Sequence, residues 1–103
     1  MMLTLRELAQ AIGGKLGAEG ELVFERVTTD SRDVRPGDLF IALQGERFDG
    51  HDFVDQVLAA GAVAAVTSKP VAGAHVLVGD TLQALGALAA AWRNRFSGVR
   101  VIA

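Results

Sequence analysis

The stretch that decides the fold is residues 28–53, which read TTDSRDVRPGDLFIALQGERFDGHDF. At its centre, residues 39–43 form a short apolar run of the kind that makes a buried strand. The run has no polar alternation, so we expect both of its faces to be buried. One face carries Leu39 and Ile41, and the other carries Phe40 and Ala42. Polar residues lie on both sides of the run, and a strand between polar loops is a common way to present side chains to a ligand.

Three segments outside the apolar run have helical spacing or helix-start signals. Residues 3–12 begin with a capping box, Thr4 and Glu7, and end at a pair of glycines. Residues 52–60 are predicted to form a second helix. Asp80 is predicted to cap a third and longest helix. Its expected apolar face consists of Leu82, Leu85, Leu88, Ala89, Trp92 and Phe96.

Short apolar segments between these helices are predicted to be strands. They are the segment around Leu16 and residues 22–27, 62–67, 75–78 and 99–103. Strands that alternate with helices indicate an α/β fold. We therefore expect residues 1–103 to form a single small, three-layer-like α/β domain of short strands and three helices.

Composition excludes several classes of function. Half of the 103 residues are hydrophobic and the formal net charge is −2, which gives no basic surface for nucleic acid. There are no cysteines, and the two histidines are far apart in the sequence, so we expect no metal site. No signal peptide or membrane-spanning run is visible, and a cytoplasmic protein is expected.

Two further features are a Gly-Lys pair near the start of the chain and the apolar residues at its end. Gly14-Lys15 is followed by Leu16 rather than Ser or Thr, and no strand precedes it, so we reject a phosphate-binding loop. The chain stops on the apolar residues Val-Ile-Ala. We interpret this as a cut at a domain boundary, which leaves the first module of a longer protein.

Three motifs in the central stretch resemble the N-terminal domain signature of the Mur ligases, the ATP-dependent amide ligases that build the peptide of bacterial cell-wall precursors. The motifs are Thr29-Asp30-Ser31-Arg32, Pro36-Gly37-Asp38-Leu39-Phe40 and Gly45-Glu46-Arg47-Phe48-Asp49-Gly50-His51-Asp52-Phe53. The third motif is most similar to the branch that adds D-alanyl-D-alanine to UDP-N-acetylmuramoyl-tripeptide. The alternative is the sister branch that adds the third amino acid, which usually lacks Glu-Arg-Phe.

The resemblance implies how the activity is divided. The N-terminal domain holds the UDP moiety of the precursor, while ATP, Mg²⁺ and D-alanyl-D-alanine bind to central and C-terminal domains that this chain lacks. The full-length protein is then a carbon–nitrogen ligase, and the chain alone is expected to be an inactive monomer without catalytic residues, bound cofactor or metal. The remaining alternative is a stand-alone α/β module that binds a small anion or a protein partner.

The resemblance also implies which residues bind the UDP moiety. They are Thr29, Ser31, Glu46, Arg47, Phe48, Asp49 and His51. Their chemistry suits the ligand, because hydroxyls can bind a ribose, an aromatic ring can stack on uracil, and the guanidinium of Arg47 offers a fork of donors to phosphate.

Each of these assignments has a structural alternative. Ser31 and Asp30 can cap a turn, and Arg32 can pair with Asp30 or Asp38 to hold the loop. Asp49 or Asp52 can cap the following helix. A lone histidine beside such a cap, as His51 is, more often has a structural role.

Overall fold

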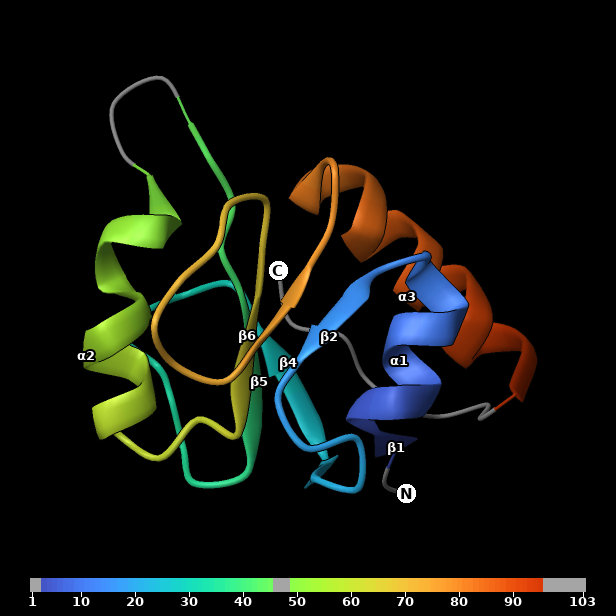
Figure 1. Ribbon diagram of the computed structural model, residues 1–103, viewed down its shortest axis with the longest axis horizontal. Helices are drawn as coiled ribbons and strands as arrows, with labels where there is room; N and C mark the ends of the chain where they lie inside the picture. The colour runs from blue at the N-terminus through green and yellow to red at the C-terminus, as the bar shows by residue number, and fades with distance from the viewer. Residues whose placement is uncertain (1–2, 46–48, 96–103) are drawn as a thin grey trace.

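A five-stranded sheet forms the centre of the molecule (Figure 1). The computed structural model describes residues 3–45 and 49–95, with side chains as far as residue 91. The strand order is β2-β7-β6-β5-β4. The strands are β2 (Lys15–Gly17), β4 (Arg26–Thr28), β5 (Asp38–Ile41), β6 (Ala64–Thr67) and β7 (His75–Leu77). Strands β4 to β7 are parallel, and β2 pairs antiparallel with β7.

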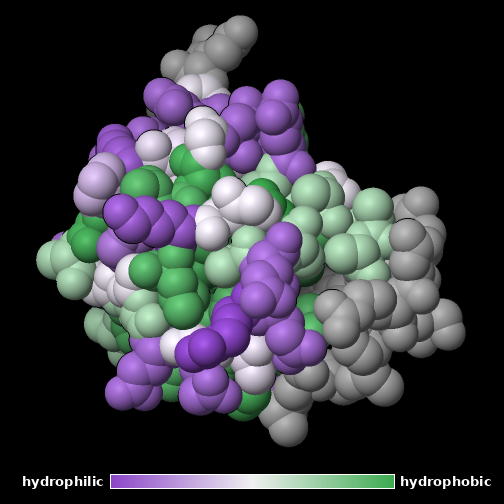
Figure 2. All heavy atoms as spheres, turned by 45° about the vertical axis from the view of Figure 1, so that its right-hand side comes forward, coloured by the Kyte–Doolittle hydropathy of each residue, from purple (hydrophilic) through white to green (hydrophobic). Residues whose placement is uncertain are grey.

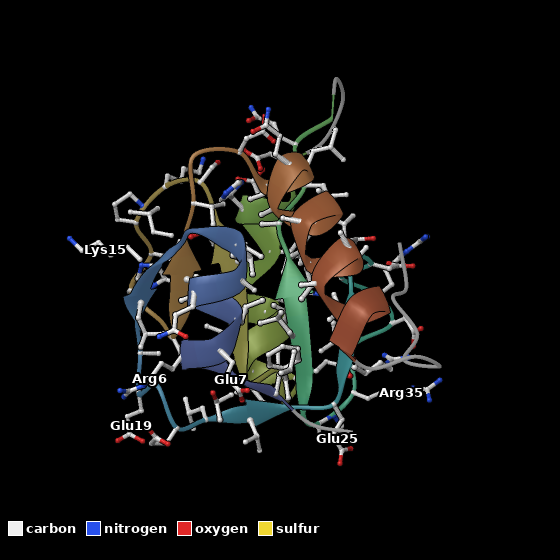
Figure 3. The ribbon with its side chains drawn as sticks, turned by 90° about the vertical axis from the view of Figure 1, so that its right-hand side faces the viewer. Arg6, Glu7, Lys15, Glu19, Glu25 and Arg35 are labelled. Carbon is white, nitrogen blue, oxygen red and sulfur yellow. The ribbon has the colours of Figure 1, made fainter. Side chains whose placement is uncertain are left out.

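Helices cover both faces of this sheet. One face carries α2 (Val54–Ala59), which follows a 3₁₀ turn, η1 (Gly50–Phe53). The other face carries α1 (Leu5–Ile12) and α3 (Thr81–Arg95), which lie side by side (Figure 3). The predicted three-layer α/β architecture with three α-helices is therefore confirmed.

The register of β5 is the one that its apolar run predicts. Leu39 and Ile41 belong to the hydrophobic cluster under α1 and α3, whereas Phe40 and Ala42 belong to the cluster under α2. All four side chains are at most 1% exposed. The backbone of β5 pairs with β4 on one side and with β6 on the other. Because hydrophobic clusters cover both faces of the strand, its sequence needs no polar alternation.

The first helix begins with the predicted capping box. Thr4 Oγ1 accepts a hydrogen bond from Glu7 N, and Glu7 Oε1 accepts one from Thr4 N, both at 3.1 Å. The helix starts at Leu5 because residues 3–4 form strand β1 (Leu3–Thr4), which pairs with β3 (Val23–Phe24). Gly13 ends the helix with a φ of 69°, a conformation that glycine adopts without strain.

The third helix presents a different face to the core from the one expected. Asp80 is its cap, as predicted, because Asp80 Oδ1 accepts from the N–H groups of Leu82 and Gln83 at 2.9 and 3.1 Å. However, Leu82 is 66% exposed, so its predicted place in the core is wrong. The side chains turned inward are Thr81, Ala84, Leu85 and Leu88. The side chain of Trp92, Phe96 and residues 99–103 lie outside the described part of the chain.

Two other predicted segments are divided. Residues 22–27 form two strands, β3 and β4, that belong to different sheets and are separated at Glu25. The second predicted helix begins as η1 before continuing as α2.

The face drawn in Figure 2 carries hydrophilic side chains around patches of hydrophobic ones. Val23 and Leu82 are the exposed large hydrophobic residues among those described. No helix in residues 3–45 and 49–95 has the length and apolar character that crossing a membrane requires.

Candidate functional site

The carboxyl ends of the four parallel strands meet at one edge of the sheet, at the top of Figure 1. The loops that follow these strands carry most of the predicted site residues. Ligands of open α/β sheets bind at this edge, because the loops there are free to vary while the strands fix their ends. Several charged side chains labelled in Figure 3, including Arg6, Glu19 and Glu25, lie at the opposite end of the molecule.

A first hollow of about 410 Å³ lies beside the loop after β4. It is lined by Thr29, Asp30, Ser31, Arg32, Phe53 and Gln56. The structure thus brings the predicted residues Thr29 and Ser31 together. Phe53 and Gln56 were not among the predicted ligand-binding residues. Phe53 is the last residue of the third motif, and Gln56 lies in α2 directly after it. A polar residue one turn beyond the motif is a weak signal in a sequence alone.

The loop that carries Ser31 is held by Asp30. Its Oδ1 accepts from Arg32 N at 2.9 Å and from Arg32 Nε at 3.2 Å. These two hydrogen bonds lower the pKa of Asp30. Arg32 therefore pairs with Asp30, one of the two partners proposed for it.

The other proposed partner, Asp38, is taken by Arg26. Arg26 Nε donates to Asp38 Oδ1 at 2.9 Å, and a second guanidinium nitrogen donates to Oδ2 at 2.6 Å. Asp38 is 2% exposed, and its Oδ2 also accepts from Arg35 N. This ion pair joins the starts of β4 and β5, away from the edge that carries the hollows.

A chain of hydrogen bonds runs from Asp49 through His51 to Ser68. Asp49 Oδ1 accepts from His51 N at 3.0 Å and lies 2.6 Å from His51 Nδ1. His51 Nε2 accepts from Ser68 N at 2.9 Å. The ring is therefore a neutral imidazole with its proton on Nδ1. The His51 side chain is only 2% exposed, so its ring is shielded from water.

The charged form of Asp49 is strongly favoured. The backbone N–H of His51, the His51 ring and the ammonium of Lys69, at 3.4 Å from Oδ2, lower the pKa of Asp49 to about 2. Asp49 is thus the cap of η1, one of the roles considered for it. Both nitrogens of His51 are engaged within the protein.

Asp49 also closes the base of the loop that contains the remaining predicted residues. It forms an isolated bridge with Gln44, and Gly50 N donates to Leu43 O at 2.7 Å. A Cβ at Gly50 would lie 3.0 Å from backbone atoms of residues 42 and 43, so this close approach favours glycine. Glu46, Arg47 and Phe48 lie outside the described residues.

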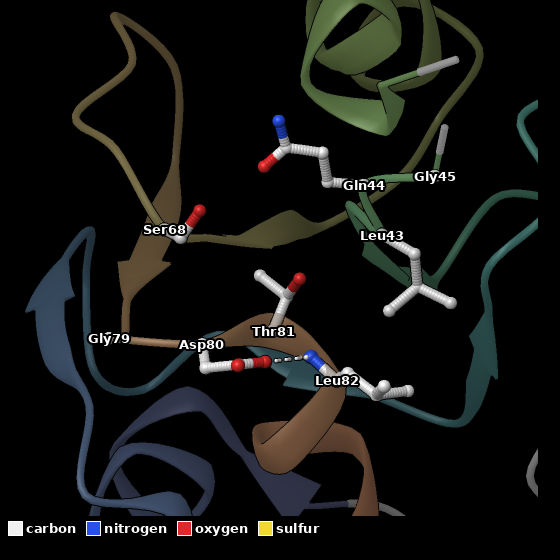
Figure 4. A pocket seen from close by; sticks show the side chains of 8 residues that line it. All are labelled: Leu43, Gln44, Gly45, Ser68, Gly79, Asp80, Thr81 and Leu82. Carbon is white, nitrogen blue, oxygen red and sulfur yellow. Dashed lines mark hydrogen bonds between the residues drawn. The ribbon is translucent and has the colours of Figure 1, made fainter. Parts of the chain in front are cut away.

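A second hollow, of about 500 Å³, lies on the α3 side of β5 (Figure 4). It is lined by Leu43, Gln44, Gly45, Ser68, Gly79, Asp80, Thr81 and Leu82. None of these residues was predicted to belong to a site. The available signal was Asp80, a capping residue directly after a strand, at the position where a helix begins on the carboxyl edge of a sheet. Among the described residues, no group of three metal-ligating side chains is close enough to hold a metal ion.

Residues 23–93 match the sequence model of a known family, described as Mur ligase family, catalytic domain. This match covers more than half of the chain. The chain belongs to the Mur ligase family. The resemblance carried by the three motifs is confirmed.

Relatives of this Mur ligase chain are known in several bacteria. It is 43% identical to the UDP-N-acetylmuramoyl-tripeptide–D-alanyl-D-alanine ligase of Escherichia coli, over 98% of this chain and 22% of that protein. It is also 43% identical to the UDP-N-acetylmuramoyl-L-alanyl-D-glutamate–2,6-diaminopimelate ligase of Listeria innocua. That match covers 65% of this chain and 14% of that protein. The chain spans about a fifth of the length of the D-alanyl-D-alanine ligases that it matches.

Solved structures agree with this assignment. MurF from Acinetobacter baumannii superposes with a TM-score of 0.85 at 39% identity, over 94% of this chain and 22% of that one. The MurF ligase of Thermotoga maritima, solved in complex with ADP, gives a TM-score of 0.65 at 41% identity, over 72% of this chain and 18% of that one.

Proposed function

We propose that this chain holds the UDP moiety of UDP-N-acetylmuramoyl-tripeptide in an ATP-dependent ligase that adds D-alanyl-D-alanine. The observation that carries the proposal is the 43% identity to the Escherichia coli enzyme of that name, which extends over 98% of the chain. With this function, the full-length ligase would use ATP and Mg²⁺ and would act in the cytoplasm.

The chemistry of bond formation is assigned to domains outside this chain. In the full-length ligase, ATP would transfer its γ-phosphoryl group to the carboxylate of the tripeptide. The amine of D-alanyl-D-alanine would then displace phosphate and form the amide. The Gly14-Lys15 pair does not fit the phosphates of ATP, because a Cβ at Gly14 would lie 2.5 Å from the Val76 side chain, and Lys15 begins strand β2. The Gly14-Lys15 pair is therefore packed into the fold rather than open to a phosphate.

The first hollow has the groups that a uridine requires. Phe53 offers an aromatic surface, and Gln56 offers both an amide donor and an acceptor for the imide edge of uracil. Thr29 and Ser31 supply hydroxyls for the ribose or the ring. A hollow with apolar walls and a few convergent polar groups is the usual form of a small-molecule site.

The diphosphate needs a cation, because the chain carries a formal charge of −2. Arg47 lies between two glycines in the sequence, next to Glu46 and Phe48, and we assign the diphosphate to it. Asp49 and His51 serve the ligand through the loop that they close, since their hydrogen bonds fix where residues 45 and 49 leave the sheet.

Substitutions of Arg47 and Ser31 in the full-length ligase test this proposal. A charge-assisted hydrogen bond contributes about 1.5–3 kcal/mol, so Arg47→Ala is expected to raise the KM for the UDP substrate roughly 10- to 100-fold. Ser31→Ala should raise it less, because a neutral hydroxyl is lost. The KM for ATP should not change.

Arg6→Ala is the matched control, because Arg6 is an exposed arginine that pairs with Glu21 at the opposite end of the molecule. It should leave both KM values unchanged. If Arg47→Ala and Ser31→Ala also leave the KM for the UDP substrate unchanged, these loops are scaffold and the site assignment is wrong.

The sister activity, addition of the third amino acid, remains the second candidate because of the match to the Listeria innocua enzyme. Product analysis distinguishes the two. The full-length protein should consume UDP-N-acetylmuramoyl-tripeptide with D-alanyl-D-alanine, and should not join diaminopimelate to the UDP-linked dipeptide.

A further inference from the structure

The ring of His51 joins two loops at the carboxyl edge of the sheet. The first is the loop after β5, which is closed at its base where Gly50 N donates to Leu43 O at 2.7 Å. The second is the loop after β6, which begins at Ser68. His51 Nε2 accepts from Ser68 N at 2.9 Å, and this hydrogen bond connects residues that are 17 positions apart. The ring therefore links the end of one strand to the end of its neighbour.

A second contact between these two loops is weaker. Lys69 Nζ lies 3.4 Å from Asp49 Oδ2, but the Lys69 side chain is 57% exposed. An exposed ion pair contributes about 0–1 kcal/mol, because water screens the charges and the long side chain loses freedom. The His51 side chain is 2% exposed, so its ring does not exchange the hydrogen bond for one to water. The His51–Ser68 hydrogen bond is the stronger of the two links.

The acceptor nitrogen of His51 serves the backbone rather than the Ser68 hydroxyl. Asp49, His51 and Ser68 have the residue types of a hydrolytic triad, in which the ring takes a proton from the serine. A neutral imidazole has one acceptor nitrogen. Here that nitrogen accepts from Ser68 N at 2.9 Å, whereas Ser68 Oγ lies farther away, at 3.3 Å. The ring is thus placed to hold two segments together and not to activate a nucleophile.

The link to Ser68 fixes a loop that carries an assigned ligand-binding residue. Gln44 and Asp49 form the bridge at the base of this loop, and Arg47 lies between them in the sequence. The bridge holds the two ends of the loop to each other, and the hydrogen bond from Ser68 holds the second end against β6. A loop that is fixed before the ligand arrives binds more tightly, because the ligand does not have to order it.

We propose that His51 is a positioning residue for the UDP substrate, and that it acts through its Nε2 hydrogen bond to Ser68 N. The Nδ1 contact with Asp49 joins residues that are two positions apart, so it orients the ring and cannot attach the loop to another strand. This inference rests on the proposed function, because it presumes that Arg47 of the same loop binds the diphosphate.

Two amide substitutions in the full-length ligase separate the two ring nitrogens. An Asn side chain reaches only as far as Nδ1, so His51→Asn can still donate to Asp49 but has no acceptor for Ser68 N. A Gln side chain is one carbon longer, and His51→Gln can place its carbonyl oxygen near the position of Nε2. His51→Asn is expected to raise the KM for UDP-N-acetylmuramoyl-tripeptide about 3- to 10-fold, as the loss of one neutral hydrogen bond does. The KM of His51→Gln should stay close to that of the wild type.

The kcat of both variants and their KM for ATP should not change, because the bond is formed on other domains. The matched controls are His75→Asn and His75→Gln. His75 is the other histidine of the chain; its Nδ1 lies 2.8 Å from Gly73 O, and it begins β7, at the edge opposite the site. Both control variants should keep the wild-type KM for the UDP substrate.

The outcomes separate a positioning role from a role in the fold alone. If His51→Asn and His51→Gln raise the KM equally, or if neither raises it, the positioning role is overturned while the proposed function stands. It is also overturned if the variants lower only kcat, in proportion to a loss of folded protein measured by circular dichroism at the assay temperature. If the wild-type ligase does not act on UDP-N-acetylmuramoyl-tripeptide, the proposed function fails, and this inference fails with it.

Discussion

At the scale of single residues, Asp49 is the group on which the geometry of the loop after β5 depends most directly. Every contact that the structure gives its carboxylate is with a hydrogen-bond donor or a cation: His51 N, His51 Nδ1 and Lys69 Nζ. These contacts stabilise the charged form in the folded state and not in the unfolded state. The stability of the protein is therefore linked to the charge of Asp49.

This linkage predicts an acid-dependent loss of stability that is smaller in D49N than in the wild type. The unfolded carboxyl titrates near 3.8 and the folded one near 2. Because the folded pKa is depressed, the stabilisation is present in full above about pH 4 and is lost as the pH falls towards 2. Urea unfolding measured between pH 6 and pH 2 should show that the free energy of unfolding falls less for D49N than for the wild type.

Asp55→Asn is the control, since Asp55 is an exposed carboxylate in the first turn of α2. The free energy of unfolding of Asp55→Asn should fall with pH by the same amount as that of the wild type. Parallel curves for the wild type and D49N would contradict the proposed linkage.

The sequence offered capping as an alternative role for Asp49, shared with Asp52, but gave no sign of the partners of His51. A cap depends on residues two or three positions away, which local pattern reveals. Ser68 lies 17 positions from His51, and the two meet because β5 and β6 are neighbours in the sheet.

At the scale of elements, α3 shows how packing overrides a simple count of apolar residues. The inward positions belong to Thr81, Ala84, Leu85 and Leu88, which follow i, i+3, i+4 and i+7 spacing. Small side chains at two of these positions allow α3 to lie close to α1. Leu82 is turned away from this face and lines the second hollow.

Two leucine substitutions in α3 test this orientation. Leu88 is 1% exposed, so Leu88→Ala should lower the free energy of unfolding by roughly 2–5 kcal/mol. Leu82 is 66% exposed, and Leu82→Ala should change it by about 0.5 kcal/mol or less. Urea denaturation of the two variants gives both values. Similar losses for the two variants would show that Leu82 belongs to the core and that the helix is rotated from the orientation described.

Strand β5 and the two segments beside it show what local pattern can and cannot predict. The apolar run of β5 specified a buried strand and its register, because a strand covered on both faces needs no polar alternation. The break at Glu25 could not be read in residues 22–27, because it depends on β3 pairing with β1 and β4 pairing with β5. Pairing partners far apart in the sequence are set by the whole fold.

At the scale of the whole molecule, the sheet separates structural from ligand-binding roles. Both of its faces are filled by hydrophobic clusters under helices. The buried Arg26–Asp38 pair joins the starts of two strands. The carboxyl edge carries the first hollow, which we assign to the uridine of the substrate. Substitutions at this edge should therefore affect binding more than folding, except where they touch the Asp49–His51–Ser68 chain.

The isolated 103-residue chain is predicted to fold but not to turn over ATP. Two covered sheet faces form a core that should unfold in one cooperative transition in urea. ATP turnover needs a phosphate-binding loop and carboxylates for Mg²⁺. The sequence has one Gly-Lys pair, Gly14-Lys15, which is packed at the start of β2, and the described acidic residues form no metal-binding group. Phosphate release should equal that of a mock purification, with the full-length ligase and its substrates as the positive control. Turnover above the mock purification by a chain that circular dichroism shows to be folded would mean that this part of the ligase contains an ATP site.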